Sequence, residues 1–163
     1  MPTFLLLLKE DDIAVKNVAL LMVYSAVHHT DEMRLVTGLM KEQILPVIYE
    51  LAQLNMERKV DLGPFKHTVD DALPLRKAAL SIVATCLEKC PSCIDIPGFM
   101  SVLAKSMGDV EDVQLQTHQI VLSMCSRHPI PLVAAADSFV EPLEKTVNKK
   151  KGSKTGVSPC IES

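Results

Sequence analysis

Apolar residues recur every three or four positions in three long segments of the chain. The clearest segment starts at Leu75, and the apolar residues after it lie on one face of a helix with 3.6 residues per turn: Ala78, Ala79, Ile82, Val83, Cys86, Leu87 and Cys90. The segments from Val15 to Val27 and from Val113 to Cys125 have the same spacing. Apolar and polar residues do not alternate over a stretch long enough to indicate an extended sheet. The pattern therefore predicts an all-α chain.

The three segments also align with one another as repeats. Each segment has an acidic residue four positions before an apolar one, and these acids are Asp11, Asp71 and Glu111. Five positions after each acid comes a basic residue or a glutamine: Lys16, Arg76 and Gln116. The acids are 60 and then 40 residues apart. A period of about 40 residues, with an acid before the helix and a basic residue in its first turns, is typical of HEAT repeats. In such proteins the acid commonly pairs with the basic residue of a neighbouring repeat. We predict a HEAT-repeat solenoid, an α-α superhelix.

Each of these helices requires a partner helix before it. The candidate partners cover residues 2–10, 32–54, 97–108 and 131–147. Pro46 and Pro142 lie inside two of them, where a proline should bend or break the helix. Residues 131–147 would be the first helix of a fourth repeat whose second helix does not follow, and the leucine-rich helix over residues 2–10 has no polar outer face. Both features indicate a piece of a longer solenoid. We therefore expect one domain over residues 1–147, followed by a polar, basic and Gly/Ser-rich tail over 148–163 that should be disordered.

The wider first spacing points to an insertion between Leu54 and Asp71. Apolar and polar residues alternate on both sides of a Gly-Pro turn signal, with Val60 and Leu62 before Gly63-Pro64 and with Phe65, His67 and Val69 after it. The pattern predicts a short β-hairpin at about residues 56–70 that stands off the helices. A lone two-stranded hairpin is marginal in water, so it needs a surface to rest on. The alternative is an ordinary surface loop packed back on the helices.

The inserted segment also carries a family resemblance. The run Val60-Asp61-Leu62-Gly63-Pro64-Phe65-Lys66-His67-Thr68-Val69-Asp70-Asp71, followed by Leu75-Arg76-Lys77-Ala78-Ala79, resembles the C-terminal region of the cullin-associated, neddylation-dissociated proteins. This region is also known as the TATA-binding-protein-interacting domain. Further matches extend the resemblance over residues 2 to 147: Thr3-Phe4-Leu5, Ile44-Leu45-Pro46 with Tyr49, and Val140-Glu141-Pro142-Leu143.

The resemblance implies a function as well as a fold. It implies a HEAT solenoid that wraps an unneddylated cullin bound to its RING subunit, with the hairpin on the adaptor-binding surface of the cullin in competition with substrate-receptor adaptors. Contact with the partner then falls on Val60 to Asp70, with Phe65 as the apolar anchor and with Lys66 and His67 as polar contacts. The expected function is a non-catalytic regulator that assembles cullin-RING (SCF-type) ubiquitin ligases and promotes substrate-receptor exchange.

Two departures from the family pattern bear on this expectation. Family members are much longer, so the chain lacks the repeats that embrace the other end of the cullin. After Thr146 the family continues through a polar linker into a last helix, which residues 148–163 do not resemble. The alternative is a generic HEAT-repeat scaffold for protein–protein interaction with other clients.

Composition narrows the possible partners. The chain has 163 residues, a formal net charge of −3, four Phe, two Tyr and no Trp, so it offers neither a basic field nor many rings for nucleic-acid bases. The longest apolar run, from Val18 to Tyr24, is far shorter than the ~20 residues that cross a bilayer. The first residues do not show the basic-then-apolar pattern of a secretory leader, so we do not expect secretion. We expect neither nucleic acid nor membrane as a partner.

Candidate chemistry is sparse. Cys90 and Cys93 have zinc-ligand or redox spacing, but no second pair completes four ligands and no βαβ context surrounds them. His28 and His29 suit the end of a helix, and His118 lies among apolar residues. We expect no enzyme activity, cofactor, metal or small-molecule substrate. The five cysteines lie mostly in apolar helical stretches, which favours reduced thiols in the cytoplasm and nucleus.

Overall fold

The computed structural model describes residues 4–30, 37–62 and 65–153, with the side chains of residues 4, 5, 61, 62, 65–67 and 149–153 outside that description. The helical elements before the insertion are α1 (Phe4–Leu7), α2 (Ile13–His29), α3 (Thr37–Leu39), the π-helical turn η2 (Met40–Ile44) and α4 (Leu45–Leu51). The strands β1 (Glu57–Leu62) and β2 (Phe65–Asp70) follow. The remaining elements are α5 (Leu73–Lys89), the 3-10 turn η3 (Pro91–Cys93), α6 (Ile96–Ser106), α7 (Glu111–Arg127), α8 (Pro129–Ala134) and α9 (Ala136–Ser153). The prediction of an all-α, HEAT-like fold with one inserted hairpin is confirmed.

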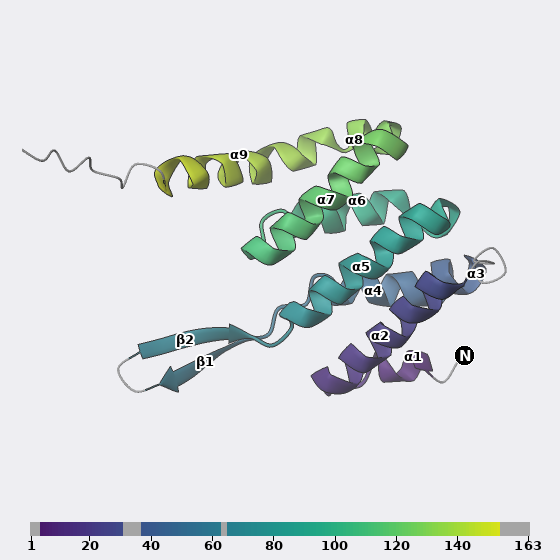
Figure 1. Cartoon of the computed structure of the whole chain (residues 1–163), viewed down its shortest axis with the longest axis horizontal. Helices are drawn as coiled ribbons and strands as arrows, with labels where there is room; N and C mark the ends of the chain where they lie inside the picture. Colours follow the sequence, from purple (N-terminus) through teal and green to yellow (C-terminus); the bar gives the residue numbers. More distant parts are fainter. Residues whose placement is uncertain (1–3, 31–36, 63–64, 154–163) are drawn as a thin grey trace, which may run out of the picture.

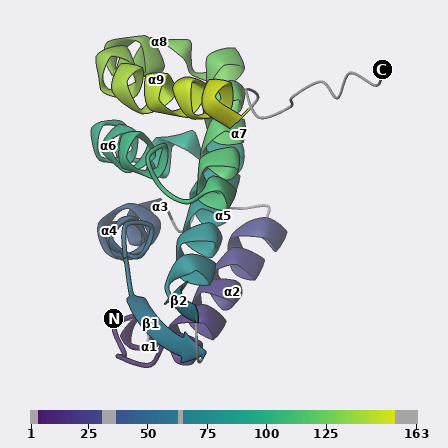
Figure 2. The same ribbon diagram turned by 90° about the vertical axis from the view of Figure 1, so that its left-hand side faces the viewer.

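The helices form two layers that stack repeat upon repeat. α2, α5 and α7 lie in one layer, while α4, α6 and α9 lie in the other (Figures 1 and 2). The core fills the space between the layers, and its largest fully buried side chains come from both: Leu20, Leu75, Leu80 and Ile82 on one side, and Leu45, Ile48, Phe99 and Leu103 on the other. Burial of these apolar surfaces is the main source of stability in the stack.

The acid that caps helix α2 is the neighbour of the one that the repeat alignment singles out. The alignment pointed to Asp11, but the carboxylate that accepts hydrogen bonds from the first free backbone N–H groups belongs to Asp12. Its Oδ1 accepts from Ala14 N at 2.7 Å and from Val15 N at 3.3 Å. Asp95 does the same for α6, where its Oδ2 accepts from Gly98 N at 3.1 Å. Both are N-cap residues, which satisfy backbone donors that have no partner inside the helix.

The two internal prolines do not break their helices. Pro46 lies near the start of α4, and the helix passes through it after the wider π-helical turn η2. Proline has no N–H to donate and its ring crowds the carbonyl four residues earlier, so a widened turn relieves both problems. Pro142 lies inside α9, and the break in this region falls instead at Ala135, between α8 and α9. The prediction of a break at Pro142 is therefore wrong.

Helix α9 also extends beyond the predicted end of the domain at residue 147. It runs to Ser153, so the first six residues of the predicted tail are helical. Between Pro142 and Gly152 the sequence holds no Gly or Pro, and the Nζ atom of Lys145 bonds Glu141 Oε1 one turn earlier at 2.7 Å. The rest of the predicted tail, residues 154–163, lies outside the described residues.

Among the described residues, helices of sufficient length and apolar character to span a bilayer are not found.

Candidate partner-binding site

The inserted segment is a regular antiparallel hairpin. Glu57 pairs with Asp70 at its base, and Leu62 pairs with Phe65 at the far end of the described strands. Figure 1 shows β1 and β2 projecting away from the helical stack from the junction of α4 and α5. The prediction of a hairpin that stands off the helices is confirmed, and the alternative of a loop packed back on them is wrong.

The structure places the predicted contact segment on this hairpin. Val60, Asp61 and Leu62 end β1, and Phe65, Lys66, His67, Thr68, Val69 and Asp70 form β2. The predicted turn residues Gly63 and Pro64 lie outside the described residues, as do the side chains from Asp61 to His67. The roles of Phe65 as the anchor and of Lys66 and His67 as polar contacts therefore stay predictions. Of the described side chains, Thr68 and Val69 are exposed and Val60 is half-buried.

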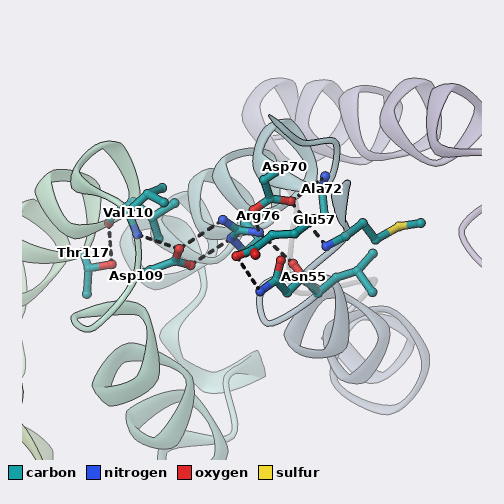
Figure 3. Close-up of polar contacts among 11 residues, drawn as sticks. Asn55, Glu57, Asp70, Ala72, Arg76, Asp109, Val110 and Thr117 are labelled. Atoms are coloured by element: carbon teal, nitrogen blue, oxygen red, sulfur yellow. Dashed lines mark hydrogen bonds and ion pairs between the residues drawn. The ribbon is translucent and has the colours of Figure 1, made fainter. Parts of the chain in front are cut away.

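Asp70 fixes the base of the hairpin to the helices. One carboxylate oxygen, Oδ1, accepts from Met56 N at 3.3 Å and from Ala72 N at 3.0 Å. The other, Oδ2, pairs with Arg76 Nη1 at 2.6 Å (Figure 3). A single side chain thus holds the residue before β1, the residue before α5 and the first turns of α5. Because Asp70 makes these internal contacts, it orients the strands that were predicted to meet the partner.

Arg76 carries this connection into the next repeat. Its side chain is 4% exposed, its Nε lies 2.8 Å from Asp109 Oδ2, and its Nη2 donates to Asp109 Oδ1 at 3.0 Å. Its Nη1 also donates to the Leu54 carbonyl at 2.9 Å. The guanidinium thus meets both carboxylate oxygens of Asp109, by a hydrogen bond from Nη2 and by a close ion-pair contact of Nε, which makes no hydrogen bond of good geometry within the described residues. The hairpin, α5 and the start of the following repeat are therefore joined through one buried cation (Figure 3).

Two further contacts extend this link between repeats. Lys77 Nζ lies 2.8 Å from Asp112 Oδ2, and Gln116 Nε2 donates to Ser81 Oγ at 2.7 Å. The expected acid–base pairing of neighbouring repeats is thus present, but the acids are Asp109 and Asp112 rather than Glu111. The repeat alignment identified Arg76 correctly, but it did not include Asp109, which lies in the loop between α6 and α7. The signal that could have found it is an acid two residues before Glu111.

The same contacts set the ionisation of Asp70. Burial of the carboxyl raises its pKa, but the hydrogen bond from Arg76, the backbone N–H groups of Ala72 and Met56, and the positive charge of Arg76 outweigh this effect. The pKa of Asp70 therefore lies below its ordinary value of 3.8. The charged form is the one that the base of the hairpin requires.

The cysteines that the spacing singled out lie in the core. Cys86, Cys90 and Cys93 are all buried, and Cys93 Sγ donates to the Cys90 carbonyl at 2.9 Å. A hydrogen bond from Cys86 lowers the pKa of Cys93 to about 7, and the same contact together with burial raises the pKa of Cys86. Within the described residues, no three side chains of His, Cys, Asp or Glu are grouped so that they could hold a metal ion. His118 is half-buried on α7.

Comparison with known proteins identifies the family. A family model described as TATA-binding protein interacting (TIP20) matches residues 35–158. The chain is 36% identical to the cullin-associated NEDD8-dissociated protein 1 of Arabidopsis thaliana over 151 residues. This alignment covers 91% of the chain and 12% of that protein. The chain is also 33% identical to the cullin-associated NEDD8-dissociated protein 2 of Rattus norvegicus over 145 residues. This alignment covers 88% of the chain and 11% of that protein.

A third relative agrees with the first two. The chain is 32% identical over 149 residues to the cullin-associated NEDD8-dissociated protein 1 of Drosophila melanogaster, covering 90% of this chain and 12% of that protein. The chain thus spans only 11% to 12% of the length of these relatives. The family model covers well over half of the chain and agrees with the resemblance seen in the hairpin segment. The chain belongs to the TATA-binding protein interacting (TIP20) family.

Proposed function

We propose that this chain is a non-catalytic, cullin-binding regulator of the assembly of cullin-RING ubiquitin ligases. The hairpin residues from Val60 to Asp70 contact an unneddylated cullin that carries its RING subunit, occupy its adaptor-binding surface and promote exchange of substrate receptors. The names of the relatives, cullin-associated and NEDD8-dissociated, support this class of partner. The buried thiols of Cys86, Cys90 and Cys93 suit the reducing cytoplasm and nucleus, which are the proposed compartments.

The observation that carries the proposal is a projecting hairpin with a fixed base. An isolated two-stranded hairpin is marginally stable, so its orientation in the free protein depends on what holds it. Here Asp70 and Arg76 join it to α5, and Asp109 joins Arg76 to the next repeat. A hairpin that is already ordered loses less conformational freedom when a partner binds. The contact segment is therefore presented in a defined direction.

Binding of a purified, unneddylated cullin–RING complex to the immobilised chain tests the proposal. We expect saturable binding, and Phe65→Ala should weaken it about thirtyfold, because truncation of a central aromatic anchor typically costs ~2 kcal/mol or more. Ile130→Ala is the matched control, since Ile130 is 82% exposed on α8, which belongs to the last helix pair of the stack and lies away from the hairpin (Figure 1). Absence of binding by the unaltered chain at tens of micromolar cullin overturns the proposal.

A competition experiment tests the adaptor-binding surface separately. A substrate-receptor adaptor added to the preformed complex should displace the chain from the cullin, because both proteins occupy the same surface. Simultaneous binding of the chain and the adaptor contradicts competition while leaving cullin binding intact.

The generic scaffold is the second candidate, and exposed apolar side chains far from the hairpin favour it. Leu122 is 68% exposed, Ile130 82% and Val133 74%. Capture of partners from a lysate, followed by mass spectrometry, separates the two candidates. Cullins should dominate the captured proteins, and Phe65→Ala should remove them selectively.

A further inference from the structure

The first and last helix pairs of the stack leave aligned apolar side chains in solvent. Helix α2 packs on α1 and α5, while α9 packs on α6 and α8, so the two helices lie at opposite ends of the stack (Figure 1). Single exposed apolar residues are ordinary on a protein surface, whereas a contiguous patch of them marks an interaction surface. Both α2 and α9 carry such a patch along one side of the helix.

On α2 the exposed patch lies opposite the buried face. Leu20 and Val23 point into the core, whereas Val18, Leu21 and Met22 are 53% to 58% exposed. Their spacing of three and four positions places these three residues, called here the α2 stripe, on one side of the helix. One lysine and three acids precede the helix at residues 9–12, all of them exposed, so this end of α2 has a net charge of −2.

On α9 a similar patch adjoins the buried face. Val140, Leu143 and Val147, called here the α9 stripe, are 40% to 52% exposed, with Phe139 buried on the adjoining side of the helix. They too are spaced by three and four positions. The sequence of the helix has three lysines at residues 149–151 and no acid after Glu144, so this end of α9 has a net positive charge.

The two stripes complement each other in charge and direction. Helix α2 begins and α9 ends on the left of Figure 1, the side from which the hairpin projects. A second copy stacked end to end in the same orientation therefore sets its α2 antiparallel to the α9 of the first copy. Met22 follows Asp12 by ten residues and Val140 precedes Lys150 by ten, which is about 15 Å of helix in each case. The apolar stripes thus align when the acidic and basic ends meet.

We propose that the chain associates head to tail with a second copy of itself, with the α2 stripe of one copy packed on the α9 stripe of the next. Burial of the apolar side chains drives the contact, and the opposite charges orient it. Because the two stripes differ and lie at opposite ends of the stack, the contact is heterologous and adds further copies instead of stopping at a two-fold dimer. The inference does not depend on the proposed function.

Sedimentation of the purified chain over a range of concentrations tests the inference without any other protein. A contact between two short stripes is small, so we expect a monomer at about 1 µM and an average mass that keeps rising above about 100 µM. A chain that remains monomeric up to about 500 µM overturns the inference and leaves both stripes to a different protein.

Two variants that each block one stripe identify the surfaces. Leu21→Asp and Val140→Asp should each weaken self-association at least tenfold, because a charge is buried in one of the two faces that every contact requires. Their equimolar mixture should form one-to-one dimers, because the intact α9 stripe of the first variant meets the intact α2 stripe of the second. Undiminished association of either variant alone, or a mixture without dimers, contradicts the pairing. Circular dichroism checks the fold, and Val18→Ser and Val147→Ser replace any variant that does not fold.

The charged ends and a control site complete the test. Glu10→Lys combined with Asp11→Lys should weaken association about threefold or more and leaves the N-cap residue Asp12 in place. Val110→Asp is the matched control, because Val110 is exposed at the start of α7, outside both stripes, where an aspartate suits the N-cap. The control should associate like the unaltered chain. Equal losses for Val110→Asp and Leu21→Asp, or an undiminished association of the charge variant, overturn the assignment.

Discussion

Arg76 is the residue on which the geometry of the hairpin depends. Its buried guanidinium contacts the carbonyl of Leu54 and the carboxylates of Asp70 and Asp109, which come from three separate parts of the chain. A buried ion pair contributes modestly when it is complete, because desolvation offsets much of the attraction. Removal of one partner is costly, because the remaining charges stay buried without compensation.

Replacement of Arg76 should therefore destabilise the chain strongly. We expect Arg76→Met to lower the free energy of unfolding by ~3–5 kcal/mol, because it leaves Asp70 and Asp109 without their cation. Urea denaturation followed by circular dichroism measures the change. Lys77→Met is the matched control: its pair with Asp112 is exposed on both sides, so it should cost less than ~1 kcal/mol. Equal losses for the two variants would contradict a buried ionic link.

The ionisation of Asp70 should appear in the pH dependence of stability. Its folded-state pKa is lower than its ordinary value of 3.8, so the unfolded chain binds the proton more tightly. The stabilisation by this group is therefore present above about pH 3.8 and is lost as the pH falls through the lower, folded-state value. Below pH 4, unfolding free energy should fall more steeply for the unaltered chain than for Asp70→Asn. Parallel pH profiles for the two proteins would exclude this role for Asp70.

At the scale of single elements, end groups and prolines determine where helices begin and how they bend. Asp12 rather than Asp11 caps α2, although the two carboxylates are adjacent in the sequence. The π-helical turn η2 lets α4 continue through Pro46. The sequence shows that an acid caps α2, but not which of two adjacent aspartates does so. It also shows a proline in the α4 segment, but not that a π-helical turn before it lets the helix continue.

The two adjacent acids at the start of α2 provide a direct comparison. Asp12→Ala should lower the free energy of unfolding by ~1 kcal/mol, because the N–H groups of Ala14 and Val15 lose their acceptor. Asp11→Ala retains this cap, and we expect a smaller loss. Thermal unfolding of both variants measures the difference, and a larger effect at Asp11 would show that the cap is misassigned.

At the scale of the whole molecule, stability should be unevenly distributed along the stack. Each helix pair packs mainly on its neighbours, as in other repeat proteins (Figure 2). The central helix α5 buries eight residues, including Leu75, Leu80 and Ile82. Helix α8, all of whose residues are described, buries none, and Phe139 is the buried side chain among those described in α9.

Hydrogen exchange should follow this distribution. We expect the amides of α5 to exchange most slowly and those of α8 and α9 to exchange fastest among the longer helical segments, because local opening of the last pair exposes little apolar surface. Hydrogen–deuterium exchange with mass spectrometry measures the order. Exchange of all helices at one common rate would indicate instead that the stack opens as a single cooperative unit.

The sequence by itself determined the helical character, the repeat period, the position of the hairpin and the family. These properties depend on local patterns: a 3.6-residue apolar spacing, a recurring acid and basic residue, and alternation around Gly63-Pro64. The continuous run from Val60 to Asp71 was distinctive enough to indicate the family, and the match over residues 35–158 agrees with it.

Only the tertiary structure decided how the hairpin is held and what lies beneath it. The contact between Arg76 and Asp109 joins residues 33 positions apart, so no local pattern specifies it. A cleft beside Ser106 likewise forms only where the ends of α4 and α6 meet the base of β1. Periodicity shows which face of a helix is buried, but the partner of a particular buried polar atom depends on how neighbouring repeats are aligned in space.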